Sequence, residues 1–270
     1  MKRMAIIFAI SATVLLSGCG GAPKPAVTAT ATPTPTPSIA GNWQLNAASA
    51  VPGTPPIAIG GSINQDGTVV SGAVHVNGSK CVDPMIAMSL TGSLNGESAS
   101  LTATGMDGQA VTFSGNFIGG GFNGTYTIKG SCVTGDQGTL TGSIVPDFDN
   151  VWTGTFTNSA QKSFKVLFAD MTQSASASSQ GSFEITGTAT FDTPCFSSGN
   201  IKPGTFPTGS FILGTSVALE FETSNGTLVF LGTEDINSGE ISGNYTLSGG
   251  TCTDNGTGVL DLQDPWDYFP

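Results

Sequence analysis

The segment FNGTYTI at residues 122–128 recurs as ISGNYTL at residues 241–247, and this repeat decides how the rest of the chain divides. When Trp43 is set against Trp152 as the start of each copy, the two segments fall at corresponding places, each a few residues ahead of the second cysteine of its copy. The aligned units are roughly 105 and 115 residues long, which is a usual size for a domain. The chain therefore contains two tandem copies of one unit, joined near residues 146–150.

The cysteines follow the same duplication. Once Cys19 is set aside, Cys81 lies opposite Cys195 and Cys132 lies opposite Cys252. Four cysteines allow three different pairings. Because equivalent positions in two copies should form equivalent bonds, we predict the disulfides Cys81–Cys132 and Cys195–Cys252. Disulfides persist in oxidising compartments, so we expect the folded part to lie beyond the inner membrane.

Both copies have the pattern of β-structure throughout. Asx-Gly pairs, which tolerate the positive φ of tight hairpin turns, punctuate the sequence. Between them, apolar and polar residues alternate, as in Val217, Leu219 and Phe221 against Glu220 and Glu222. A period of two with one apolar face is typical of half-buried antiparallel strands. We expect about eight strands in the first copy, around residue 43 and at residues 57–64, 69–76, 86–94, 98–103, 110–117, 121–128 and 138–144.

Short strands joined by hairpins leave exposed edges unless the sheet closes, and closure into an up-and-down barrel removes them. The opening Gly41-Asn42-Trp43 and the later Gly-x-Tyr element resemble the lipocalin and avidin group of small eight-stranded barrels. This resemblance implies an all-β fold of two tandem antiparallel meander barrels. An Ig-like or jelly-roll β-sandwich remains the alternative fold. The aromatic residues that mark the two domains are Trp43, Tyr126, Trp152 and Tyr245.

The N-terminus reads as a targeting signal. Lys2 and Arg3 precede an apolar run at residues 5–16, which is too short to span a bilayer, and the box Leu16-Ser17-Gly18-Cys19 follows. This arrangement resembles a bacterial lipoprotein signal, which implies acyl chains such as palmitate on Cys19. We therefore expect a lipid-anchored protein of the cell envelope. Because Gly20 rather than aspartate follows the cysteine, we expect the outer membrane, at its periplasmic face or the cell surface, if the source is Gram-negative.

These signals divide the chain into four parts. We expect a signal peptide at residues 1–18, a lipidated cysteine with a Thr/Pro-rich linker at 19–38, a first β domain at 39–146 and a second at 147–270. The linker is too polar and proline-rich to form a core, so it should act as a semi-rigid spacer. The second domain ends in DPWDYFP at residues 264–270, an aromatic tail that we expect to pack at a barrel mouth, between the domains or on another protein.

The charge balance excludes some partners. Charged residues make up 10% of the chain, against roughly 25% in typical soluble domains. The net charge is −11 and the single arginine, Arg3, lies in the signal. An acidic surface repels phosphate backbones and anionic lipid surfaces, so we expect no nucleic-acid partner and membrane association only through the lipid anchor.

No arrangement of residues points to catalysis. His75 is the only histidine, and we expect it on an outward strand face, exposed to solvent rather than part of a catalytic triad. Glu220 and Glu222 share one outer face, which does not suit a glycosidase pair. Residues 147–150 lack the glycine and distal glutamate of a calcium loop and read as an acidic linker. Without a CxxC pair, a zinc site is not expected either. We expect no enzyme activity, no metal and no cofactor.

The composition of the two cores suggests where a ligand could bind. The second copy holds most of the phenylalanines, whereas the first contains Phe113, Phe117 and Phe122 among many small residues. An eight-stranded barrel either fills with side chains or holds one small ligand. We therefore expect a non-enzymatic binding module for a small apolar ligand or an envelope partner. The alternative is a structural or interaction scaffold with solid barrels and no ligand.

Overall fold

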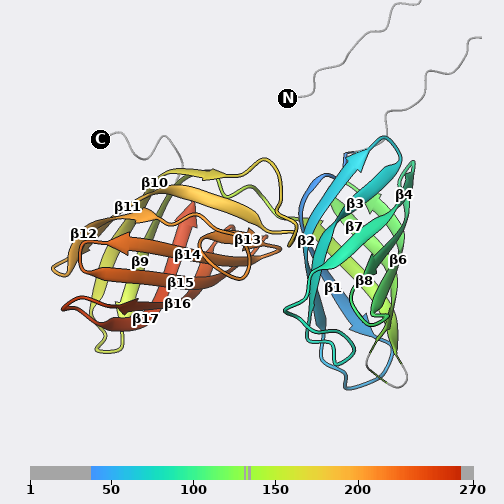
Figure 1. Cartoon of the computed structure of the whole chain (residues 1–270), viewed down its shortest axis with the longest axis horizontal. Helices are drawn as coiled ribbons and strands as arrows, with labels where there is room; N and C mark the ends of the chain where they lie inside the picture. The colour runs from blue at the N-terminus through green and yellow to red at the C-terminus, as the bar shows by residue number, and fades with distance from the viewer. Residues whose placement is uncertain (1–37, 131, 133–134, 263–270) are drawn as a thin grey trace, which may run out of the picture. The chain divides into compact units, whose positions relative to one another are not determined.

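Two antiparallel β-barrels follow one another along the chain in the computed structural model, which describes residues 38–130, 132 and 135–262 (Figure 1). All the regular elements within these residues are β-strands. The described residues contain no helix that is long and apolar enough to cross a membrane. The all-β prediction and the tandem barrels are therefore confirmed. Cys19, the linker up to residue 37 and the aromatic tail lie outside the described residues.

The first barrel contains β1 (Gly41–Ser49), β2 (Ile57–Asp66), β3 (Val69–Asn77), β4 (Met88–Asn95), β5 (Ser98–Thr104), β6 (Ala110–Ile118), β7 (Gly121–Lys129) and β8 (Asp136–Ile144). Each strand pairs with the next in antiparallel fashion, and β1 pairs with β8, which closes the barrel. The strands begin and end within one or two residues of the predicted bounds. The turns also behave as expected, since Asp107 and Gly108 have φ angles of 54° and 75°.

The second barrel contains β9 (Asn150–Asn158), β10 (Ser163–Gln173), β11 (Phe183–Thr193), β12 (Phe196–Ile201), β13 (Phe211–Leu213), β14 (Ser216–Thr223), β15 (Gly226–Glu234), β16 (Ile241–Ser248) and β17 (Asp254–Leu262). Pairing of β9 with β17 and of β10 with β11 closes a ring of eight strands. The short β13 is the additional strand. Both β12 and β13 lie between β11 and β14, so together they take the place that β4 holds in the first barrel.

A tryptophan near the start of each barrel packs inside it and is held by the chain that precedes it. The Trp43 Nε1–H donates a hydrogen bond to the Ile39 carbonyl at 2.8 Å, and the Trp152 Nε1–H donates to the Asp149 carbonyl at 3.2 Å. Both indoles are almost fully buried, and buried indoles require such an acceptor. The same contact in both copies indicates that the duplication extends to the local geometry of the barrel ends.

A buried tyrosine and an aspartate lie toward the opposite end of each barrel. The Tyr126 hydroxyl donates to Asp136 Oδ2 at 2.8 Å, and the Tyr245 hydroxyl donates to Asp254 Oδ2 at 3.0 Å. Burial, followed by the hydrogen bond to the carboxylate, raises the pKa of both tyrosines well above the usual value. The phenols therefore remain protonated and act as permanent donors to these carboxylates.

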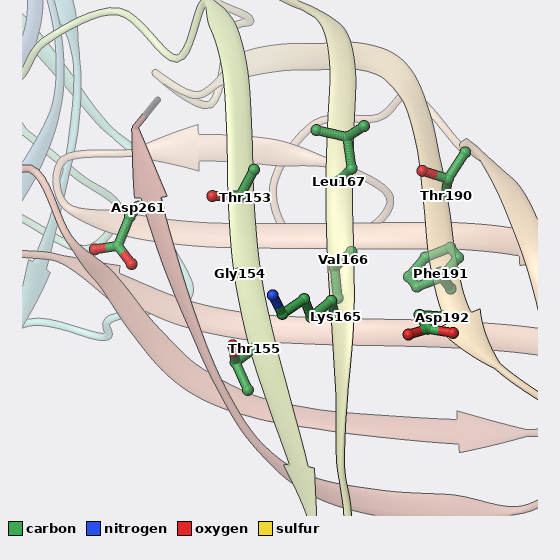
Figure 2. A pocket seen from close by; sticks show the side chains of 10 residues that line it. All are labelled: Thr153, Gly154, Thr155, Lys165, Val166, Leu167, Thr190, Phe191, Asp192 and Asp261. Carbon is green, nitrogen blue, oxygen red and sulfur yellow. The ribbon is translucent and has the colours of Figure 1, made fainter. Parts of the chain in front are cut away.

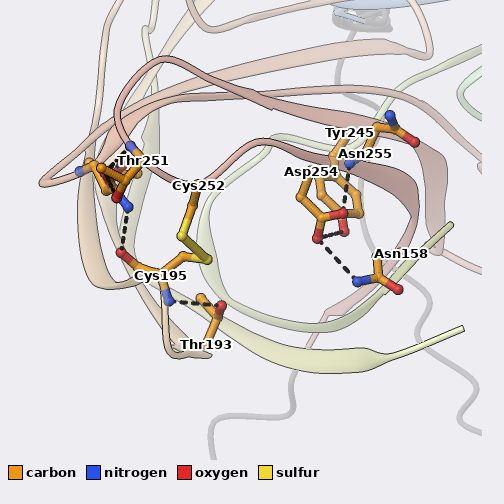
Figure 3. The surroundings of a disulfide bond; sticks show 10 residues. Asn158, Thr193, Cys195, Tyr245, Thr251, Cys252, Asp254 and Asn255 are labelled. Carbon is orange, nitrogen blue, oxygen red and sulfur yellow. Dashed lines mark hydrogen bonds between the residues drawn. A yellow bond between two sulfur atoms is a disulfide. The ribbon is translucent and has the colours of Figure 1, made fainter. Parts of the chain in front are cut away.

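The predicted disulfides, Cys81–Cys132 and Cys195–Cys252, are both present. Each joins the segment after the third strand of its barrel to the segment before the last strand. Figure 3 shows the second disulfide on the same part of the barrel as the Tyr245–Asp254 pair. The bridged cysteines are 51 and 57 residues apart in sequence. Cross-links of this span remove roughly 4 kcal/mol of chain entropy from the unfolded state.

Candidate functional site

The interior of the first barrel is nearly full. Its cavity measures about 10 Å³, close to the smallest volume that admits one water molecule. Trp43 packs edge-on against Phe117 with ring centroids 5.0 Å apart, and Phe117 lies 4.8 Å from Phe122. These three rings occupy the space that the small residues elsewhere in the core leave free. A drug-sized apolar ligand does not fit inside this barrel, because such ligands require cavities of about 300 Å³ or more.

Two polar side chains of β1 point away from the first barrel but are buried, because the second barrel covers them. Both barrels belong to one compact unit. Asn42 Nδ2 donates to the Gly214 carbonyl at 2.9 Å, and the Gly214 amide donates to Asn42 Oδ1 at 2.8 Å. Gln44 Oε1 accepts from the Thr215 amide at 3.2 Å. The side-chain amide of Asn42 thus bonds both the N–H and the carbonyl of Gly214, and Gln44 bonds the next residue. The turn between β13 and β14 is therefore fixed to β1.

The two backbones approach closely at this contact. Gly214 has a φ of +55°, a conformation that favours glycine, and a Cβ added there would lie 2.8 Å from the Gly60 Cα. A Cβ on Gly60 would in turn lie 3.1 Å from the Gly214 Cα. A side chain at either position would separate the barrels, so the two glycines are required for the hydrogen bonds of Asn42 and Gln44.

His75 does not lie in solvent, and the prediction that it is exposed was wrong. The side chain points outward from β3 as expected, yet only 5% of its surface is exposed. Its Nδ1 lies 3.0 Å from the Pro84 carbonyl and its Nε2 lies 3.0 Å from the Gln180 carbonyl, while its ring packs 4.5 Å from Phe206. Gln180 and Phe206 belong to the second barrel, more than a hundred residues away, so the local strand pattern could not reveal this burial.

Two segments of the second barrel that have no counterpart in the first make these contacts. Residues 174–182 connect β10 to β11, whereas only Gly67 and Thr68 separate β2 from β3. Residues 202–210 separate β12 from β13, whereas β4 is continuous. The first segment supplies Gln180 and the second supplies Phe206. The second copy therefore carries elements, absent from the first, that contact the first copy.

Beside this contact lies an open groove of about 660 Å³ with walls from both barrels. In the second barrel its wall is made of outward-facing apolar residues of β13, β14 and β15, and in the first it is made of residues of β2 and of the segment after β3. The second-barrel residues Phe206, Phe211, Leu213 and Ala218 form a hydrophobic cluster of their own outside the barrel core. We call this the inter-barrel groove, and its principal apolar residues are Ala58, Pro84, Met85, Phe206, Phe211, Leu213, Ala218 and Leu231.

The groove leaves large apolar side chains in water. Leu231 is 59% exposed and Met85 is 57% exposed, one on each wall. Polar groups line it as well, namely the side chains of Gln44, His75 and Thr215. Outward positions of a half-buried strand are normally polar, so a concentration of exposed apolar residues there makes the groove a candidate binding surface. Apolar walls with a few converging polar groups are the usual composition of a binding site.

A second hollow of about 660 Å³ lies on the outer face of β9, β10, β11 and β17. Figure 2 shows Lys165 extending toward β9, with Asp192 and Asp261 to either side of it. Thr153 and Thr155 supply hydroxyl groups. This surface is polar and shallow, without a nucleophile beside a base, and we assign no binding role to it.

Glu234 is an ionisable residue whose burial the sequence pattern did not predict. It ends β15 on the inward face and is only 5% exposed, and this desolvation raises its pKa from 4.5 to about 7. Strand pairing explains its place. Phe113 pairs with Tyr126 and Phe230 pairs with Tyr245, so Glu234 occupies the position that Phe117 holds in the first barrel. Within the described residues, no group of three or more His, Cys, Asp or Glu side chains that could hold a metal ion occurs.

Three other acidic residues of the second copy have structural partners. Glu220 forms an ion pair with Lys202 at 2.7 Å. Asp149 Oδ1 accepts from the Gln173 amide at 2.8 Å, and Asp147 Oδ1 accepts from Gln173 Nε2 at 3.1 Å. Between these aspartates, Phe148 is fully buried and stacks 4.7 Å from Trp152. The segment that was expected to be an acidic linker is therefore packed against the second barrel.

No family model, no curated protein and no solved structure matches this chain. The tandem barrels are established by the structure, while the relationship to lipocalins and avidins stays a resemblance of pattern.

Proposed function

We propose that this protein is a lipid-anchored protein of the cell envelope that acts as a non-enzymatic binding module for an envelope partner. The observation that carries the proposal is the inter-barrel groove. The cavity inside the first barrel measures about 10 Å³, whereas the groove measures about 660 Å³ and exposes apolar side chains on both walls. Binding on the outer surface is therefore favoured over a small apolar ligand enclosed in a barrel.

The geometry of the groove supports a preformed site. Asn42 and Gln44 hold the β13–β14 turn, and His75 meets the segments that contribute Gln180 and Phe206. Because these contacts are buried, they fix one groove wall relative to the other before a partner arrives. A preorganised site loses less conformational entropy on binding, so more of the interaction energy contributes to affinity.

The lipoprotein-like N-terminal sequence supports the proposed location in the cell envelope. The lipoprotein-like box ending at Cys19 and the Thr/Pro-rich linker would hold both barrels away from the membrane surface, in the outer membrane of a Gram-negative source. The net charge of −11 argues against nucleic acid and against direct contact with anionic lipid. We propose no enzymatic activity and no cofactor. The alternative, a scaffold with no ligand, differs only in leaving the groove empty.

Site-specific photo-crosslinking in the native envelope tests the proposal. A photoreactive residue at Leu231 or Met85, in the groove, is compared with one at Ile118, an equally exposed apolar residue on β6 of the first barrel. We expect the two groove positions to give one common adduct and Ile118 to give none.

The captured protein is then purified and its affinity measured. We expect Leu231→Asp to weaken binding at least tenfold and Ile118→Asp to leave it within twofold. Absence of any groove-specific adduct, together with a native mass free of bound ligand, would support the scaffold alternative.

A further inference from the structure

We propose that His75 is a pH switch, which fixes the walls of the inter-barrel groove when both nitrogens of its ring carry a proton and releases one wall when a proton is lost. This inference rests on the proposed function, because the groove that His75 controls is the proposed binding site. His75 is itself a groove residue and contacts segments of both barrels. A change in its charge therefore acts on both walls.

Both ring nitrogens of His75 face backbone carbonyl groups. Nδ1 lies 3.0 Å from the Pro84 oxygen, and Nε2 lies 3.0 Å from the Gln180 oxygen. A carbonyl oxygen accepts hydrogen bonds but cannot donate them, so each contact requires a proton on the nitrogen. A neutral imidazole has one N–H group, whereas an imidazolium has two. The two contacts are therefore both hydrogen bonds only when His75 is a cation.

The third neighbour of the ring also suits a cation. The centroid of the Phe206 ring lies 4.5 Å from that of the His75 ring, at an interplanar angle of 54°. This distance is within the range of about 6 Å over which an aromatic ring attracts a cation. Two carbonyl dipoles and one aromatic ring thus replace the water that the buried imidazolium gives up.

Few titratable groups belong to the elements that pack against His75. Residues 174–182 contain none, and no other residue that lines the groove is titratable. The titratable side chains of the other packed elements are Asp66 at the end of β2, Lys80 and Asp83 between β3 and β4, and Lys202, which pairs with Glu220 at 2.7 Å. Among the described residues no carboxylate forms an ion pair with His75. The two carbonyl groups are therefore the contacts that distinguish its charged form from its neutral form.

Loss of one proton leaves a lone pair of the ring directed at a carbonyl oxygen, which is a repulsive contact. Pro84 belongs to the same barrel as His75, in a segment that the Cys81–Cys132 disulfide ties down. Gln180 belongs to a surface segment of the second barrel that lies against β3, where a Cβ added to Gly181 would meet the Ala73 carbonyl. The segment at residues 174–182 is therefore the one that moves away when His75 is neutral.

Phe206 transmits this movement to the groove. Its amide donates a hydrogen bond to Ser182 Oγ at 3.0 Å, and its ring packs 5.6 Å from Phe211 on the groove wall. Histidine is the side chain that changes its charge between about pH 5 and pH 8. The groove is accordingly preorganised at the acid end of this range and loosened at the alkaline end, so a partner should bind more tightly in acid.

Selective ¹⁵N labelling of histidine in the untagged full chain tests the inference, because His75 is the only histidine and gives one pair of ring signals. We expect two protonated ring nitrogens at about pH 5.5 and one at about pH 8. The protection of the Phe206 amide from hydrogen exchange, corrected for the intrinsic effect of pH, should fall about tenfold between these values. The Phe117 amide, which donates to the Glu97 carbonyl at 2.8 Å within the first barrel, is the control and should keep its protection.

His75→Gln provides a second comparison, because a glutamine side chain is neutral at both pH values. We expect the protection of the Phe206 amide in this variant to be the same at both, at the low level that the wild type has at about pH 8. The ring signals of the wild type need no substitution, so they test the inference even if this variant folds poorly.

Two results would overturn the inference. The first is a ring nitrogen without a proton at about pH 5.5, or two protonated nitrogens at about pH 8. The second is loss of the proton with the protection of the Phe206 amide unchanged. Failure of the proposed function is distinguishable, since Phe206 would then lose protection as expected while crosslinking from Leu231 and Met85 finds no partner. If a partner crosslinks equally at both pH values and Phe206 keeps its protection, only the present inference fails.

Discussion

The two barrels have the same closed ring of eight strands but differ in how they use the space outside it. Each has a buried tryptophan near its start, a tyrosine–aspartate hydrogen bond and a disulfide at equivalent positions. Only the second barrel carries the segments at residues 174–182 and 202–210, and these segments contact His75 of the first barrel. The duplicated core supplies stability, whereas one added segment contributes Phe206 to the groove that we propose as the binding surface. The differences between the copies, rather than their similarity, therefore lead to the proposed site.

The largest effect should come from the disulfides, and it should be similar in the two copies. Replacing Cys81 and Cys132 by alanine, or Cys195 and Cys252 by alanine, frees loops of similar length. We expect either pair of substitutions to lower the free energy of unfolding of its barrel by about 3 to 4 kcal/mol, because the unfolded chain regains entropy. Urea unfolding monitored by tryptophan fluorescence measures this. A loss confined to one barrel would show that the copies do not use their disulfides equally.

The tyrosine–aspartate pairs should be the next most important. Tyr126→Phe and Tyr245→Phe each remove the phenol that donates to Asp136 or Asp254. Because hydrogen bonds to charged groups contribute about 1.5 to 3 kcal/mol, we expect about 2 kcal/mol of destabilisation in each barrel. Equilibrium unfolding of the two variants gives the comparison. Asp136 also accepts from Ser49, and Asp254 from Asn158, so a marked difference between the variants would mean that one of these donors compensates.

Glu234 should make the stability of the second barrel depend on pH, whereas the equivalent position in the first barrel is occupied by Phe117, which does not ionise. The pKa of its carboxyl is raised to about 7 in the folded state, so the folded protein binds the proton more tightly than the unfolded chain does. The ionised carboxylate of Glu234 lowers the free energy of unfolding. This effect is absent below about pH 4 and reaches its full value above about pH 7. With solvent screening taken into account, we expect Glu234→Gln to stabilise the protein by about 1 to 2 kcal/mol at pH 8 and not at pH 4.

Thermal or urea unfolding of Glu234→Gln at both pH values checks this expectation. Glu220→Gln, on the outer face of β14, is the control and removes a carboxylate that is only partly buried and paired with Lys202. A gain for Glu234→Gln that is the same at pH 4 and pH 8 would indicate a packing effect rather than ionisation.

The smallest effect concerns the contact between the barrels. Asn42→Ala removes both hydrogen bonds to Gly214, and we expect it to lower stability by about 1 kcal/mol and to loosen the groove. Asn46→Ala is the matched control, since Asn46 is on the same outward face of β1 but is exposed. We expect it to change stability by less than about 0.5 kcal/mol. Hydrogen exchange of the Gly214 and Thr215 amides reports the local loosening, and unchanged protection in Asn42→Ala would argue against a fixed contact.

The sequence predicted the barrels because their determinants are local or repeated. Alternation such as Val217, Leu219 and Phe221, together with Asp-Gly and Asn-Gly turns, fixes strands and hairpins within a few residues. The repeat fixes the disulfide pairing, because aligned cysteines must form equivalent bonds. These signals need no knowledge of distant parts of the chain.

The groove could not be predicted in this way. Asn42 and His75 have the polar character of any outward strand residue, and only Gly214 and Gln180 of the other copy show that they are buried. Phe211 and Leu213 read as ordinary core residues, although they point outward. One signal was available: residues 174–182 and 202–210 are the segments that the alignment of the two copies leaves unmatched.

The neighbouring ends of the first barrel determine how it would respond to mechanical tension. The first residues of β1 pair with the last residues of β8, and Trp43 lies opposite Ile144. A force applied through the N-terminal linker and the second barrel would therefore pull on both strands at the same end of their pair. Hydrogen bonds loaded in this geometry break one after another rather than together, and the barrel would open at low force. The Cys81–Cys132 bond lies beyond that opening and holds the residues between the two cysteines, 51 positions apart, out of the extended chain. If the chain is anchored and bound as we propose, the extension of the first barrel under load would be limited by this disulfide.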